Sequence, residues 1–83
     1  MWIRTQDKKE IVNISRFKIT PIYGSKIKKA RISGYVSNVS SLTDYITPLG
    51  DYPSMEEAIS EMDNIQEFIL KNPIGVYEMT KSK

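Results

Sequence analysis

The chain has 83 residues, of which 40% are hydrophobic and 27% are charged, and it carries a net charge of +2. This is the composition of a folded chain, and the length has room for one domain, residues 1–83. The chain has no cysteine and no histidine, which excludes disulfides, thiolate zinc sites, thiol nucleophiles and histidine bases. A core this small usually needs further stabilisation, and self-association is the means that remains.

Alternating apolar and polar residues predict short β-strands in the first half of the chain. We expect them at residues 2–5, 11–14, 17–20 and 28–37. The apolar positions are even before Ser15 and odd after Arg16, so a bulge or a break is expected between them. Pro21 should lie at a strand end because it donates no hydrogen bond to a ladder.

The strand at 28–37 should divide its side chains between two faces. Ile32 and Val36 fall on one face, and Arg31 and Tyr35 fall on the other. A loop at 38–44, a short strand at 45–49 and a turn at 50–53 are expected to follow.

Residues 54–71 predict an amphipathic helix. Ser54, with Glu57 three residues later, fits a capping box, and Asn72-Pro73 should end the helix. Apolar residues recur at three- and four-residue spacing, so the acidic residues are expected on the other faces of the helix. The acidic residues are Glu56, Glu57, Glu61, Asp63 and Glu67. A last strand is expected at 75–79, paired either within the chain or with another subunit.

This order of elements predicts an α+β fold, with an antiparallel β-sheet of four or five strands and one helix, at about 54–71, packed across one face. The helix should use Ala58, Met62, Ile65 and Ile69 for this contact. On the sheet we expect it to cover Phe17, Ile19, Ile32 and Val36. The opposite face keeps Lys, Arg and Tyr side chains, so solvent, a ligand or a second subunit must cover it.

Basic residues are concentrated at the front of the chain. Residues 1–34 carry nine basic and two acidic residues, whereas residues 35–83 carry three basic and eight acidic ones. Guanidinium groups bind phosphate and aromatic rings stack on bases, so this set predicts a phosphate-bearing ligand. We expect phosphate contacts from Arg4, Arg16, Lys28 and Arg31, and stacking surfaces from Trp2 and Tyr35. The alternative is that the lysines protect strand edges and the arginines pair with acids of the helix.

The opening Trp-Ile-Arg-Thr-Gln-Asp at 2–7 resembles a group of small proteins of Gram-positive bacteria and their phages that begin W-I-R-[ST]-Q-D. The likeness continues in Leu-Gly-Asp-Tyr at 49–52, in the helix, and in Val-Tyr-Glu-Met at 76–79. Residues 20–48 do not share it. Phage proteins of this size include anti-defence sponges, homo-oligomers that bury a cyclic nucleotide immune signal in basic, aromatic pockets. This second likeness concerns the kind of protein and not a shared sequence motif, so it assigns no role to any residue.

We therefore expect a non-enzymatic homo-oligomer that binds a phosphorylated small molecule, as a phage sponge for nucleotide messengers does, without a cofactor or a metal. Two alternatives stay open, namely a protein-interaction module that inhibits a host protein and a single-stranded nucleic-acid binder. The chain has no cysteine, no apolar leader and no apolar stretch long enough to span a membrane. We therefore expect it in the cytoplasm and not in a membrane. If a phage encodes the chain, this is the cytoplasm of the host.

Overall fold

Six strands and one helix follow one another in the part of the chain that the computed structural model describes, residues 1–24, 26–36 and 45–80. They are β1 (Trp2–Arg4), β2 (Ile11–Asn13), β3 (Arg16–Pro21), β4 (Ala30–Val36), β5 (Tyr45–Tyr52), α1 (Met55–Lys71) and β6 (Val76–Glu78). The predicted α+β class is confirmed. The loop expected at 38–44 lies outside the described residues. None of the described residues belongs to a helix with the length and apolar character needed to cross a membrane.

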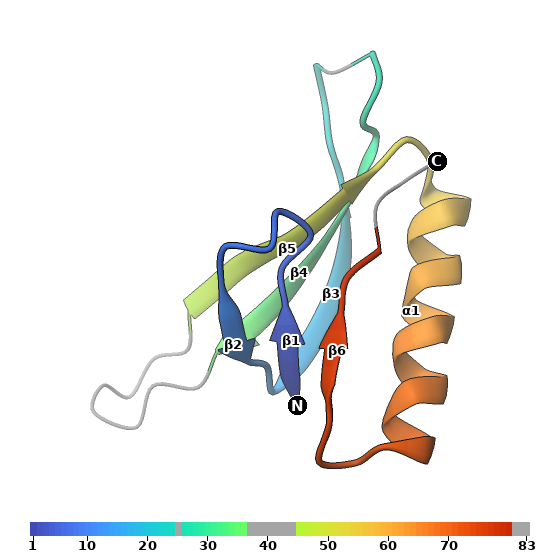
Figure 1. Cartoon of the computed structure of the whole chain (residues 1–83). Helices are drawn as coiled ribbons and strands as arrows, with labels where there is room; N and C mark the ends of the chain where they lie inside the picture. Colours follow the sequence, from blue (N-terminus) through green and yellow to red (C-terminus); the bar gives the residue numbers. More distant parts are fainter. Residues whose placement is uncertain (25, 37–44, 81–83) are drawn as a thin grey trace.

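The strands form two three-stranded sheets instead of one (Figure 1). Sheet A has the order β2-β1-β6, and sheet B has the order β3-β4-β5. All pairs are antiparallel except β1 and β6, which run parallel with Ile3 opposite Tyr77. The last strand therefore pairs within the chain.

The change of apolar phase at Ser15-Arg16 marks the point where the chain passes from one sheet to the other. β2 ends at Asn13 and β3 begins at Arg16. The Ser15 N–H donates to the carbonyl of Tyr35 on β4 over 2.8 Å, so the crossing is fixed against sheet B. Pro21 is the last residue of β3, as predicted.

β5 is longer than predicted and contains residues 50–52, which we expected in a turn. Two observations explain the difference. Leu49 is an extra residue in β5, because Ile32 of β4 lies opposite Gly50 while Ser33 lies opposite Pro48. The Gln6 N–H donates to the Leu49 carbonyl over 2.8 Å, so a residue of the loop that follows β1 holds β5 at this bulge.

Sheet A and α1 share one core with sheet B (Figure 1). Strands of both sheets, residues that follow them and α1 contribute the buried apolar side chains, while β2 and β3 add partly buried ones. The buried side chains are Ile3, Ile14, Ala30, Ile32, Leu49, Tyr52, Ala58, Ile65, Tyr77 and Met79. Gly34 allows β4 to approach the β2–β3 crossing, because a Cβ atom there would lie 2.5 Å from Cδ1 of Ile14.

α1 begins and ends where the sequence predicts. The Ser54 hydroxyl accepts a hydrogen bond from the Glu57 N–H over 3.1 Å, and the Asn72 N–H donates to the Phe68 carbonyl over 2.7 Å. Ala58 and Ile65 are buried as expected. Met62 is partly buried, whereas Ile69 remains 36% exposed.

Glu61 corrects the predicted helix face, because it is buried with only 2% of its surface exposed. Its carboxylate accepts hydrogen bonds from the Tyr77 hydroxyl over 2.9 Å, the Tyr52 hydroxyl over 3.2 Å and the Thr80 N–H over 2.6 Å. An acid was expected to face solvent, but donors from β5 and from the chain around β6 replace the water it would lose. Glu61 thus ties α1 to both sheets.

Candidate binding site

Sheet B presents its second face away from the shared core. The register of β3 and β4 and the alternation of their side chains place three opposed pairs on this second face. The pairs are Arg16 with Tyr35, Lys18 with Ser33, and Thr20 with Arg31. The residues between them point toward sheet A and α1. We call these six residues the outer face. As the sequence predicted, Arg31 and Tyr35 lie on the side opposite Ile32.

Arg16 and Tyr35 form the central feature of the outer face. The guanidinium carbon of Arg16 lies 4.1 Å from the centre of the Tyr35 ring, a cation–π contact between directly opposed residues. Within the described residues Arg16 makes no ion pair, and its side chain is exposed. The contact keeps the guanidinium over the ring, and its N–H groups can still donate to a ligand.

Arg31 differs from Arg16 because it already has an anionic partner. Its Nε donates to Oδ1 of Asp51 over 2.7 Å, and its Nη2 donates to Oδ2 over 3.2 Å. These hydrogen bonds raise the pKa of Arg31 above its ordinary value. A phosphate at Arg31 would therefore compete with the Asp51 carboxylate.

A cleft of about 440 Å³ begins beside Arg31, between the loop at 5–10 and β5. Lys28 and Arg31 line it, but so do Asp7, Glu10 and Asp51. The lining thus carries three acids against two bases. This balance does not favour a phosphate inside the cleft, and it makes the cleft an extension of the outer face with mixed charge.

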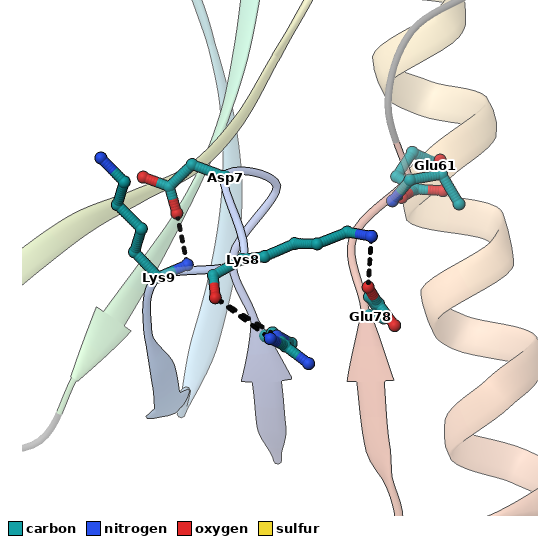
Figure 2. Close-up of polar contacts among 7 residues, drawn as sticks. Asp7, Lys8, Lys9, Glu61 and Glu78 are labelled. Atoms are coloured by element: carbon teal, nitrogen blue, oxygen red, sulfur yellow. Dashed lines mark hydrogen bonds and ion pairs between the residues drawn. The ribbon is translucent and has the colours of Figure 1, made fainter.

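The loop that forms one wall of the cleft is fixed by its own polar contacts (Figure 2). The Asp7 carboxylate accepts hydrogen bonds from the Thr5 hydroxyl over 2.6 Å and from the Lys9 N–H over 3.0 Å, and both lower the pKa of Asp7. Lys8 has a positive φ of 66°, and its ammonium lies 3.5 Å from the Glu78 carboxylate on β6. The loop that forms this wall is thus a turn stabilised by hydrogen bonds within it and by an ion pair to β6.

Trp2 and Arg4 lie on β1 in sheet A, on either side of the buried Ile3. Trp2 is 48% exposed, and the Arg4 guanidinium donates to the Lys8 carbonyl over 3.3 Å. The six predicted residues therefore occupy three places. Arg16 and Tyr35 form one pair, Arg31 and Lys28 line the cleft, and Trp2 and Arg4 belong to the other sheet.

Lys18 belongs to the basic residues of the predicted strands, but it was not among the six residues expected to contact the ligand. Lys18 is exposed and follows Arg16 by two positions on the same strand, which places both on the outer face. The alternation of β3 was sufficient to identify it. Glu61 carried no comparable signal, because its burial depends on Tyr52 and Tyr77 from distant strands.

No protein-family model, no curated protein and no solved structure matches this chain. Any functional assignment therefore has to be argued from the geometry of the described residues.

Proposed function

We propose that this chain is a non-enzymatic binding protein that takes a nucleotide on the outer face of sheet B. One observation carries the proposal, namely the Arg16 guanidinium carbon lying over the Tyr35 ring, 4.1 Å from its centre. A base can stack on an arginine or tyrosine side chain at such a pair, and a phosphate can accept hydrogen bonds from the guanidinium. Lys18 adds a second exposed cation two residues away.

The proposal includes a homo-oligomer. Arg16 and Lys18 of the outer face are exposed, although Ser33 is only 4% exposed. A small nucleotide bound at Arg16 therefore stays in contact with solvent unless a second copy covers it. A sponge for a nucleotide immune signal needs such a cover over its bound nucleotide, since a withheld signal must be enclosed. If a phage encodes the chain, the same binding would withhold an immune signal in the host cytoplasm, which is an anti-defence role.

The test is calorimetric titration of the protein with cyclic mono-, di- and trinucleotides and cyclic ADP-ribose isomers. Arg16→Ala should weaken the binding of the active nucleotide by roughly 10- to 150-fold, because a charge-assisted hydrogen bond contributes about 1.5–3 kcal/mol. Arg4→Ala is the matched control, since it removes an arginine from sheet A. Unchanged affinity of the Arg16→Ala variant would contradict the proposed site, and native mass spectrometry would report the subunit count with any retained nucleotide.

A second candidate is single-stranded nucleic acid, and the openness of the outer face favours it. Basic and aromatic side chains on an exposed sheet are the usual platform for such strands. The two candidates differ in their response to salt. Affinity for an oligonucleotide should fall steeply as salt rises, because each neutralised phosphate releases counterions. Tight binding of an oligonucleotide with no response to any small nucleotide would favour the second candidate.

A further inference from the structure

α1 carries a mainly apolar stripe, of which only Met62 packs against the core. Met55, Ile59, Met62, Gln66 and Ile69 follow one another at alternating four- and three-residue spacing, which places them on one side of the helix. Met55 is 41% exposed, Ile59 is 49% exposed and Ile69 is 36% exposed. The ridge that enters the core is the neighbouring one, formed by Ala58, Glu61 and Ile65.

The stripe runs into a groove of about 240 Å³ between α1 and β3. Its apolar lining comes from Phe17 of β3 and from Met62, Ile65, Ile69 and Leu70 of the helix. Leu70 is 78% exposed at the end of this lining. Exposed apolar side chains beside a groove mark interaction surfaces, and methionine adapts its shape to a partner.

The charges around the groove are negative. Asp63 is the one charged residue in its lining; it is exposed, and among the described residues it has no ion pair. Glu56 and Glu67 are exposed elsewhere on the helix. The one base of α1, Lys71, lies 2.9 Å from the Glu67 carboxylate. A partner with positive charges beside its apolar residues is therefore complementary to this surface.

We propose that the stripe and groove of α1 dock a cationic amphipathic helix of a partner protein. Met55 and Ile69 are 14 positions apart, which corresponds to about 21 Å of helix and to about four turns of the partner. A second copy that docked through its own α1 is a poor occupant, because it would bring an equally acidic helix against this one. This surface is separate from the outer face of sheet B and does not depend on nucleotide binding.

The experiment uses two labelled synthetic helices of about 15 residues, roughly four turns. Both carry leucine at the a and d positions, one carries lysine at the flanking positions, and the other carries glutamate there. Fluorescence anisotropy with the native protein should show binding of the lysine peptide only. Equal binding of both peptides, or of neither, would overturn the proposal.

Variants then locate the binding surface. Asp63→Lys should weaken the lysine peptide by about 5- to 30-fold and improve the glutamate peptide, because attraction at the rim becomes repulsion. Leu70→Ser should weaken binding by about 10-fold or more through lost apolar contact. Ile74→Ser is the matched control, since Ile74 is 95% exposed and outside the lining.

Three results in these variants would overturn the proposal. The first is an equal loss with Ile74→Ser and Leu70→Ser, which would show non-specific apolar contact. The second is lysine-peptide affinity that Asp63→Lys does not change. The third is sedimentation of the protein alone as a dimer that Leu70→Ser dissociates, because a second copy would then occupy the groove. Arg16→Ala should leave peptide binding unchanged, so failure here and failure of the nucleotide proposal can be told apart.

Discussion

Glu61 is the residue whose environment departs most from its type. A carboxylate that is 2% exposed is stable only because several donors surround it, including the hydroxyls of Tyr52 and Tyr77. Glu61→Ala leaves the Tyr77 hydroxyl and the Thr80 N–H without this acceptor, whereas the Tyr52 hydroxyl keeps the Thr80 carbonyl at 2.8 Å. We expect a loss of roughly 2–5 kcal/mol in the free energy of unfolding, measured by urea denaturation. Glu67→Gln, on the exposed side of α1, should barely move the midpoint, and a similar loss in both variants would contradict the special role of Glu61.

Gly34 is a second residue fixed by its surroundings. An added Cβ would lie 2.5 Å from Cδ1 and 2.8 Å from Cγ2 of Ile14, which is itself 2% exposed. Gly34→Ala should therefore cost about 1–3 kcal/mol of stability through overpacking. In the Ile14→Ala background those atoms are absent, so the same substitution should cost much less. Equal costs in both backgrounds, measured by thermal unfolding, would show that the clash is relieved by backbone movement.

At the scale of elements, the tyrosines around Glu61 make the contact between α1 and the sheets sensitive to alkali. Burial, and then the Glu61 carboxylate, raise the pKa of Tyr52 and Tyr77 above the ordinary value of 10.0. Above that pH the unfolded chain releases these protons while the folded chain keeps them, so stability is complete below about pH 10 and falls as the pH rises further.

Urea midpoints measured between about pH 9 and about pH 11 should show this fall. Tyr77→Phe should make the decline shallower, because one of the two groups is removed. Tyr23→Phe serves as the control, since Tyr23 is 87% exposed and should leave the slope unchanged. A native protein whose midpoint is flat across this range would contradict the assigned environment.

Elements with a local signal were predictable from the sequence, and their grouping was not. The Ser54 cap, the Asn72-Pro73 end and the alternation of β3 are encoded within a few neighbouring residues. The division into two sheets depends on the pairing of β1 with β6, which lie at opposite ends of the chain. The same limit applies to the site, because Arg16 and Tyr35 were both selected as binding residues, but only the register of β3 and β4 makes them a pair.

The whole molecule depends on one core to which sheet A, sheet B and α1 all contribute. Ile3, Ile32 and Ile65 represent the three parts, and each is at most 2% exposed. Glu61, Gln6 and the chain around Thr80 add polar connections between them. A molecule joined in this way should unfold as a unit, although sheet A is assembled from the two ends of the chain.

Met79→Ala tests this cooperativity. Met79 is 2% exposed, and its N–H donates to the Arg4 carbonyl over 3.0 Å, so truncation should cost about 2–5 kcal/mol. Trp2 is the single tryptophan and reports on sheet A, while far-ultraviolet circular dichroism is dominated by α1. If the core is shared, both signals shift to the same lower urea concentration and their curves still coincide. A curve from Trp2 that shifts alone would mean that sheet A unfolds independently, and the two sheets would then be separate cooperative units.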